Sequence, residues 1–247
     1  MPVFAMTTVH VAAGDVFLSA FADNVSLTAQ QDERDVTTFA SGGWRQKIGA
    51  LSNAQLTVSG FQDFVAPGVD PSLPATTITD SALVPWSVSV PGTTAGDVAY
   101  FGQARRAMVV PVRGAVGDVA GFDMEFDGSG RIVRGLMAAP RASRVATGNG
   151  TSIALAGPSA TQSLYVAFHL HSVTGTPGTV QFTVQTDDNV GFSSATTRIT
   201  STAFTAPGSQ FTSVAGAFAS ETHIRVNHTL TTFTEATFSV VVGVANT

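Results

Sequence analysis

Three carboxylates at alternate positions are the residues of this chain best suited to chemistry. Asp123, Glu125 and Asp127 are separated by single apolar residues, and because successive side chains of a strand point to opposite faces, the three carboxylates share one face. A pair of carboxylates is what a glycoside hydrolase uses, but those two groups face each other across a cleft. The spacing therefore predicts an acidic strip along one strand and not an active site.

Two interpretations of the acidic strip are open at the level of sequence. In the first, the strip is the solvated side of a hairpin, in which the turn Gly128–Gly130 leads to Arg131 and Arg134, whose charges balance the carboxylates across the strands. In the second, copies of the strip are repeated around a ring and form a negative inner wall, past which a polyanion slides. Neither interpretation requires a metal or a cofactor.

The other candidate ligands are two histidines and an acidic turn. His169 and His171 share one face of a predicted strand with Tyr165, and since no third ligand is suggested nearby, we expect two strand-surface histidines rather than a metal site. The turn Asp187–Asn189 lacks the ligand spacing of a calcium loop. No nucleophile elbow, phosphate-binding glycine loop or metal-binding helix pattern occurs, so we expect no enzyme activity, no metal and no cofactor.

The composition indicates a mainly β protein. Only 12% of the 247 residues are charged, a single lysine occurs, and there is no cysteine, so disulfides and thiolate metal sites are excluded. No segment has the roughly 18 uninterrupted apolar residues of a membrane span, and Met1–His10 lacks the basic start and apolar run of a secretory signal. The sequence predicts a soluble protein, made in a cytoplasm, with no membrane partner.

The charge is concentrated in the first part of the chain. Residues 1–140 hold 13 Asp or Glu against 8 Lys or Arg, whereas residues 141–247 hold 4 of each, so the whole net charge of −5 lies before position 141. Tight binding of nucleic acid requires clustered Lys and Arg that neutralise phosphates. This distribution disfavours tight nucleic-acid binding and favours a surface to which DNA does not adhere.

The stretch Asp35–Phe64 connects two predicted strands. Residues 24–31 and 53–64 alternate apolar and polar side chains, as half-buried strands do. Gly42–Gly43 interrupts the pattern, and Trp44 follows directly. A Trp after two glycines indicates a loop side chain that is held on a neighbouring surface.

Other parts of the first 140 residues give weaker predictions. The turn Gly14–Asp15 predicts a hairpin near the N-terminus. Five prolines between Val65 and Pro91 predict a long surface excursion with an edge strand over Trp86–Val90. The sequence of Gly96–Phe101 recurs with one change at Gly117–Phe122, which two stacked hairpins explain without any function.

After Pro140 the composition shifts. Arg141–Asn149 is short and polar and is predicted to be a linker. Seven strand candidates follow within about a hundred residues, which is typical of a β-sandwich. They are 151–156, 163–173, 179–187, 195–204, 210–218, 222–231 and 236–245.

Three motifs carry a resemblance to a known family. A strand followed by Asp35–Phe39 (DVTTF), then Gly42–Arg45 (GGWR), and later Gly96–Phe101 (GDVAYF) resembles the major tail (tail-tube) proteins of long-tailed bacterial viruses, the siphophages. The resemblance covers residues 15–137. It departs from the family after Phe64, where the prolines disfavour the helix that the tail-tube fold usually has.

The resemblance implies a structural virion protein. Copies would form stacked, commonly hexameric rings whose strands join into a barrel around a conduit for double-stranded DNA, with other tail proteins such as the tape measure and tail terminator as partners. Such a protein is located in the virion tail after assembly in the bacterial host cytoplasm. We expect a tail-tube domain over 1–140, a linker over 141–149 and a β-sandwich over 150–247 on the outer face. The predicted subunit interface comprises Asp35, Phe39, Gly42, Gly43, Trp44 and Arg45.

Two questions stay open within this interpretation. The lumen is expected to be lined by 119–137 with its acidic strip, and the alternative inner strand is 53–64, whose polar set is Gln55, Thr57 and Ser59. The rival class is a viral fibre or carbohydrate-binding sandwich, supported best by 148–247, where Tyr165 is the strongest candidate for an exposed aromatic.

Overall fold

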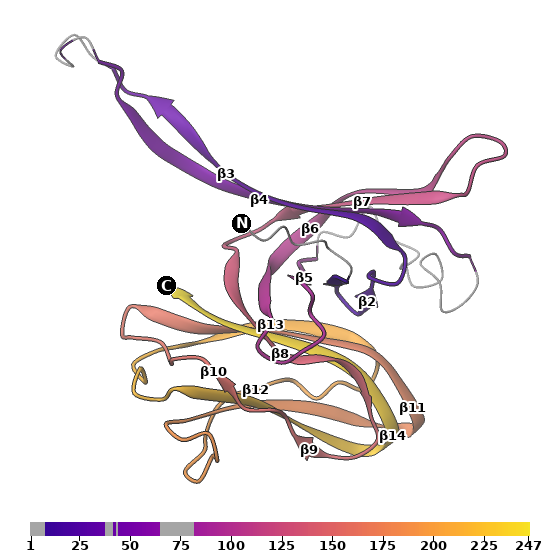
Figure 1. Cartoon of the computed structure of the whole chain (residues 1–247), viewed down its shortest axis with the longest axis vertical. Helices are drawn as coiled ribbons and strands as arrows, with labels where there is room; N and C mark the ends of the chain where they lie inside the picture. The colour runs from indigo at the N-terminus through magenta and orange to yellow at the C-terminus, as the bar shows by residue number, and fades with distance from the viewer. Residues whose placement is uncertain (1–7, 38–41, 43, 65–81) are drawn as a thin grey trace. The chain divides into compact units, whose positions relative to one another are not determined.

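A computed structural model describes residues 8–37, 42, 44–64 and 82–247, and in this part of the chain all regular structure is β. The mainly β prediction is confirmed. No helix in the described part has the length and apolar character needed to cross a membrane. The strands (Figure 1) are β1 His10–Ala13, β2 Val16–Phe17, β3 Ala22–Asp35, β4 Lys47–Phe61, β5 Val84–Ser89, β6 Val98–Arg113, β7 Gly121–Gly128, β8 Val133–Arg144, β9 Gly148–Asn149, β10 Ile153–Ala154, β11 Gln162–Asp187, β12 Thr196–Thr200, β13 Gly208–Ala215 and β14 His223–Asn246.

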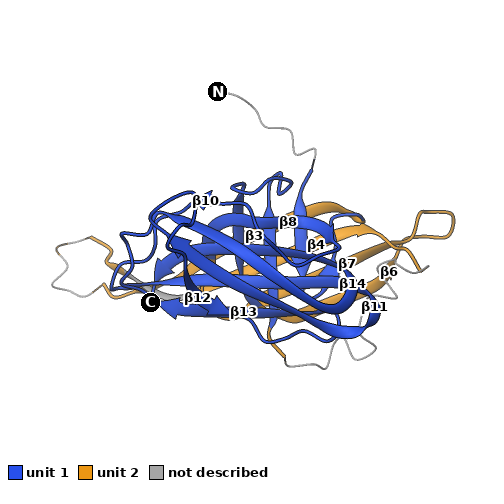
Figure 2. Cartoon of the chain, turned by 90° about the horizontal axis from the view of Figure 1, so that it is seen from below, with its two compact units in different colours: residues 1–20, 84–103, 133–247 blue, residues 21–83, 104–132 orange. Residues whose placement is uncertain are grey.

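The chain forms two compact units (Figure 2). Unit 1 contains residues 1–20, 84–103 and 133–247, and unit 2 contains residues 21–83 and 104–132, so β6 contributes to both. This differs from the division at 141–149 that we expected from sequence. Residues of the expected linker belong to β8, which continues to Arg144 and pairs with β14.

Two very long strands organise unit 1. β11 and β14 pair along their whole lengths, from Gln162↔Asn246 to Asp187↔His223, with register shifts near 170–179. The strands bend at these register shifts, and the neighbour of β11 changes there. The first half of β11 pairs with β13, and the second half pairs with β12. Strands that bend at bulges and change sheets are a known way to form the corner of a sandwich. The segments predicted separately as 163–173 and 179–187 are therefore one strand, as are 222–231 and 236–245.

The corner depends on glycine. A Cβ on Gly178 would lie 1.7 Å from the carbonyl oxygen of Thr231, and Gly175 has a φ of 105°. The backbones of β11 and β14 thus approach too closely for any side chain at Gly178.

Unit 1 has a continuous apolar core. Phe168 stacks on Phe182 at a centroid distance of 5.3 Å, and Phe182 also meets Phe204 and Phe238 edge to face. Side chains on both faces of β11 are buried, because Val166 and Phe168 lie in one cluster and Ala167 in another. Burial on both faces explains why this part of the chain is rich in Val, Ile and Phe.

The N-terminal hairpin prediction is confirmed, and the edge-strand prediction is wrong. β1 and β2 pair around Gly14, which has a φ of 66°. β5 is hydrogen-bonded to β1 on one side and to β6 on the other, and Trp86 is buried. Proline misled the prediction because Pro85 lies at the second position of the strand, where the ladder tolerates it.

Unit 2 contains a four-stranded antiparallel sheet in the order β3-β4-β7-β6. β7 pairs with β4 through Asp123↔Ser59 and with β6 through Asp123↔Val110. The proline-rich excursion, and with it the question of the family's helix after Phe64, lies largely outside the described residues.

The sequence repeat is a repeated turn. In both copies the Asp amide donates to the carbonyl three residues back, Asp97 to Thr94 at 3.2 Å and Asp118 to Ala115 at 3.0 Å. The carboxylate of the same Asp accepts a hydrogen bond in return, from the N–H of Thr94 to Asp97 at 2.8 Å and from the N–H of Ala115 to Asp118 at 3.1 Å. The preceding glycines have φ angles of 98° and 99°. The repeat therefore encodes a turn that starts an apolar strand, and no function is needed to explain it.

Candidate assembly surface

The acidic strip forms as the alternation predicted. Asp123, Glu125 and Asp127 lie on one face of β7 and are partly or fully exposed, while the intervening residues are buried. Those buried residues are Phe122, Met124 and Phe126. The sheet of unit 2 therefore has one apolar and one polar face at this strand.

The positive partner of the strip differs from the prediction. The predicted hairpin, in which the strand with Arg131 and Arg134 pairs with β7, is wrong. β7 pairs with β4 and β6, and Arg134 lies in β8 opposite Tyr100. The ion pair that the structure gives the strip joins Arg113 Nε to Asp123 Oδ2 at 3.0 Å. The arginines of β6 were missed because they lie ten or more positions upstream of Asp123, on the far side of a hairpin whose register the sequence does not reveal.

The two candidate inner strands are neighbours in one surface. Gln55 lies opposite Asp127 and donates from Nε2 to Glu125 Oε1 at 2.5 Å and to Asp127 Oδ1 at 3.3 Å. Thr57 and Ser59 pair with Glu125 and Asp123. From sequence, β4 and β7 were alternative candidates for the strand that lines the lumen. In the structure their polar side chains lie side by side on a single face of the sheet, which we call the polar face.

This four-stranded sheet has two open sides in the described part of the chain. On one side β3 pairs only with β4. On the other, β6 also neighbours β5 along part of its length, and among the described residues 107–110 pair with β7 alone, before a bulge beyond Val110 together with Pro111 ends the regular stretch. Unpaired N–H and C=O groups along such edges are ready to pair with a strand of another chain.

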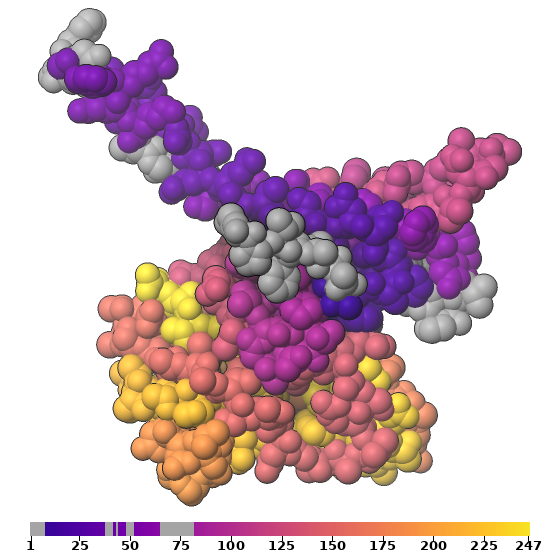
Figure 3. Space-filling model, viewed as in Figure 1, coloured from indigo at the N-terminus to yellow at the C-terminus, as the bar shows by residue number. Residues whose placement is uncertain are grey.

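The outer half of the β3–β4 pair is a two-stranded ribbon, and within the described residues no third strand pairs with it, although residues 130–132 lie beside its inner end. Every described residue of β3 from Thr28 to Asp35 is exposed, and β7 reaches only as far as Gln55 on β4. Figure 3 shows this ribbon as a narrow arm of unit 2 that is open to solvent on the face in view. An isolated two-stranded ribbon is marginally stable in water, so its length favours a role in contact with another chain.

The predicted interface residues gather at the tip of this ribbon. Trp44 is 81% exposed, and Arg45 beside it is also exposed. Gly42 has a left-handed φ of 62°, which accounts for a glycine in the turn. Asp35 ends β3, and of the remaining predicted residues, Phe39 and Gly43 lie outside the described part of the chain.

Hydrogen bonds hold the base of the tip. The Thr37 amide donates to Asp35 Oδ1 at 2.9 Å, and hydrogen bonding from Thr37 lowers the pKa of the Asp35 carboxyl. Lys47 forms an ion pair with Glu33, which raises the pKa of the Lys47 ammonium. The ribbon thus presents Trp44 from an ordered base.

His169 is buried and His171 is half-buried, so neither lies on an open strand surface, which corrects the prediction. His169 donates from Nδ1 to the Gly14 carbonyl at 2.7 Å, and His171 donates from Nδ1 to the Asp15 carbonyl at 2.7 Å. Their rings stack at 6.2 Å. His10 lies close to both, and mainly because of burial its pKa falls to about 3, that of His169 to about 4 and that of His171 to about 3. In the described part of the chain no three His, Asp or Glu side chains are grouped so that they could hold a metal.

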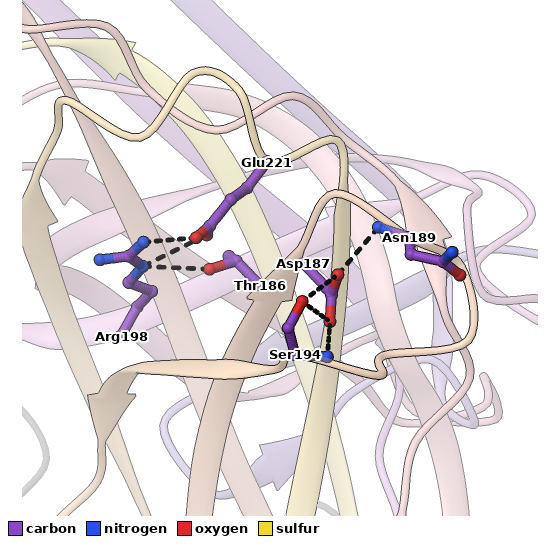
Figure 4. A network of polar contacts seen from close by, with 6 residues as sticks. All are labelled: Thr186, Asp187, Asn189, Ser194, Arg198 and Glu221. Atoms are coloured by element: carbon purple, nitrogen blue, oxygen red, sulfur yellow. Dashed lines mark hydrogen bonds and ion pairs between the residues drawn. The ribbon is translucent and has the colours of Figure 1, made fainter.

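The acidic turn is a structural device (Figure 4). The carboxylate of Asp187 accepts the amide of Asn189 at 2.9 Å and the amide of Ser194 at 2.8 Å, and these bonds lower its pKa against the opposing effect of desolvation. Arg198 nearby pairs with Glu221 at 2.6 Å. Both carboxylate oxygens of Asp187 accept hydrogen bonds from backbone N–H groups. The role of this acidic turn is therefore to hold the loop from Asp187 to Ser194 closed.

Tyr165 is not an exposed platform. It is half-buried, and its ring packs against Phe211 at a centroid distance of 5.9 Å. Phe211 in turn meets Phe101 at 6.1 Å. The main sequence argument for a carbohydrate-binding sandwich therefore loses its strongest residue.

Comparisons with known proteins give likeness of fold only. No protein-family model matches the sequence, and no curated protein sequence matches it. Similar solved structures include a chain of the native gene transfer agent virion, 14% identical over 53% of this chain and 97% of that one, with a TM-score of 0.41. Another is the Dit protein of phage SPP1, described as a hub of the adsorption apparatus, 8% identical over 97% and 100% with a TM-score of 0.35. A third is a chain of the PVC sheath-tube complex, from an extracellular contractile injection system, 12% identical over 55% and 92% with a TM-score of 0.40.

Proposed function

We propose that this protein is a structural subunit of a phage tail, and specifically that copies join through unit 2 into stacked rings forming a tail tube. The observation that supports this most is the sheet β3-β4-β7-β6, which has one polar face and, within the residues that the structure describes, an edge at β3 and a stretch of β6 with no further strand beside them. The sequence motifs that resemble tail-tube proteins, Asp35–Phe39 and Gly42–Arg45, lie at the end of the same sheet.

An even number of antiparallel strands allows such sheets to close into a ring. In unit 2 each strand is antiparallel to its neighbour, so β3 and β6 at the two edges run in opposite directions. When β3 of one copy lies beside residues 107–110 of β6 in the next, the new pair is again antiparallel. The pattern repeats without a break for any number of copies, and a closed ring leaves no edge unpaired.

The width of the barrel favours six copies. With strands about 4.8 Å apart and tilted by about 40°, three copies would give a barrel about 24 Å across at the backbone and six copies one about 48 Å across. Side chains reduce the opening by about 5 Å on each side. A ring of three is then too narrow for double-stranded DNA, and a ring of six admits it.

The polar face is proposed to line this conduit. Six copies of Asp123, Glu125 and Asp127 repel phosphates, while Gln55 and Arg113 moderate the charge. Clustered cations would instead trap DNA through counterion release. Changing the three acids together to lysine should leave tubes intact and slow genome ejection, with the defect easing as salt rises. Normal ejection by this variant at low salt would place the lumen elsewhere.

Unit 1 is proposed to lie on the outside of the tube, and its sandwich to decorate the rim. The further partners would be the tape measure protein within the tube and the terminator at its end, with assembly in the bacterial cytoplasm. None of these roles needs a catalytic group or a cofactor.

Negative-stain microscopy of the purified protein over a range of concentrations tests the function. Stacked rings forming tubes are expected. Single rings that never stack would indicate a hub protein instead of a tube protein. Monomers or trimers at every concentration would favour the fibre interpretation. Either of these two results contradicts the proposal.

A further inference from the structure

A pocket lies at the end of the unit 2 sheet opposite the ribbon tip. It has a volume of about 270 Å³ and is lined by residues of all four strands' ends and of the β6–β7 turn, among them Asp23, Phe61, Arg113, Asp118 and Val119. A ligand pocket for a small organic molecule is usually larger, at about 300–1,000 Å³. The size of this pocket suits one large side chain.

The lining of the pocket combines charged groups with apolar side chains whose exposure a monomer does not explain. Phe61 and Val119 are both exposed, and so are Val112 and Val116 on the same hairpin. Arg113 contributes a guanidinium whose Nε is paired with Asp123. A planar cation beside an aromatic ring is a favourable environment for an indole, which stacks on Phe and receives the cation on its face.

The tip of the ribbon and the pocket cannot meet within one molecule. Asp23 and Asp35 lie near the two ends of β3, and at about 3.3 Å per residue they are about 40 Å apart. Figure 1 shows the β3–β4 ribbon and the β6–β7 hairpin extending from opposite ends of the unit 2 sheet. Only a second copy can bring Trp44 to the pocket.

The two ends of the sheet differ in charge. The tip is neutral, with Arg34, Arg45 and Lys47 against Asp32, Glu33 and Asp35. The pocket end carries −2, from Asp23, Asp63 and Asp118 against Arg113. A neutral tip meets the acidic pocket end without the repulsion that two acidic ends would have, which favours head-to-tail contact.

We propose that Trp44 of one copy inserts into the Phe61–Arg113–Val119 pocket of the next copy along the tube axis. The inference rests on the proposed function and adds the contact that stacks one ring on another. Because tip and pocket are different surfaces, the contact is heterologous and does not close on itself, so it generates a filament. Its repeat equals the length of the sheet along the axis, about 30–40 Å when the strand tilt is included.

Cysteine crosslinking tests this contact, because the natural chain has no cysteine. A variant with both Gln46→Cys and Val119→Cys should form a ladder of disulfide-linked multimers when tubes are oxidised. Each single variant should form no species beyond a dimer, since one cysteine per chain can link only two copies. Absence of a ladder from oxidised tubes of the double variant overturns the inference.

Substitution gives an independent measurement. Trp44→Ala should raise the protein concentration needed for tubes at least about tenfold, as loss of an interface anchor does. Val190→Ala, a matched exposed apolar residue in unit 1, should assemble as the natural protein does. Circular dichroism and thermal unfolding of both variants should match the natural protein.

The outcomes separate the two proposals. If the natural protein forms no tubes, the proposed function fails. If it forms tubes, and Trp44→Ala forms them equally well, the function stands and the stacking contact through Trp44 is wrong.

Discussion

The core of unit 1 and the ribbon of unit 2 contain similar strands in opposite surroundings. β11 is buried on both faces over residues 166–170 and on one face over 180–186, whereas β3 is exposed on both faces from Thr28 onward. Unit 1 holds six Asp or Glu against five Lys or Arg, and the smaller unit 2 holds eleven against seven. The comparison indicates that unit 1 gains its stability from its own packing, while the ribbon of unit 2 leaves its strands exposed, as the proposed assembly requires.

Removing one aromatic ring from unit 1 and one from unit 2 should give the largest difference in unfolding free energy between the two regions. Phe182→Ala removes a ring that contacts Phe168, Phe204 and Phe238, and should lower the free energy of unfolding by about 3–5 kcal/mol. Phe61→Ala removes an exposed ring of unit 2 and should change it by less than about 0.5 kcal/mol. Urea denaturation of the two variants measures the difference. Equal losses would contradict the comparison.

Acid should act on unit 1 through its buried histidines. Their folded-state pKa values, about 3 to 4, lie below the unfolded value of 6.5, so the unfolded chain binds more protons once the pH falls below 6.5. Stability is therefore fully present above pH 6.5 and is lost as the pH falls toward 4, by up to about 1.4 kcal/mol per pH unit for each histidine.

One histidine can be removed to measure this loss. His171 contacts Asp15 and Ser239, with Arg141 the nearest cation acting on its charge. His171→Gln should remove about a third of the pH dependence between pH 6.5 and 4, which is about 2 kcal/mol at pH 5. His223→Gln, outside the cluster, should keep the natural dependence. An unchanged slope in His171→Gln would show that the cluster does not limit stability in acid.

The smallest effect is expected at the ion pair of the polar face. Arg113 and Asp123 have side chains that are 52% and 27% exposed, and such pairs contribute about 0.2–1 kcal/mol. Arg113→Ala should lower the unfolding free energy within this range at low salt and less at high salt. A loss above about 2 kcal/mol would mean that the pair is structural and that the polar face is not a free surface.

The sequence predicted what depends on local pattern. Alternation placed Asp123, Glu125 and Asp127 on one face, and Gly14 and Gly42 marked real turns, because side-chain periodicity and left-handed φ angles leave a direct trace in residue type. Trp44 after two glycines was correctly expected in a loop outside the core, since regular core residues have no such neighbours, while its contact with a neighbouring surface stays a prediction.

The sequence failed where partners are distant along the chain. The ion pair of Asp123 with Arg113 depends on the register of a bulged hairpin, and the burial of His169 depends on a hairpin 155 positions away. The units exchange segments of chain at positions 20, 83, 103 and 132, so no shift in composition marks their boundary. Long-range pairing of this kind is set by the whole fold and not by any window of residues.

Cryo-electron microscopy of tubes assembled from the purified protein tests the central claim most directly. We expect sixfold rings, an inner barrel of twenty-four strands from β3, β4, β7 and β6, and a polar face turned toward the lumen. The axial repeat should be about 30–40 Å. An inner wall formed by β11 and β14 of unit 1, or rings in which the edges of unit 2 remain unpaired, would contradict it.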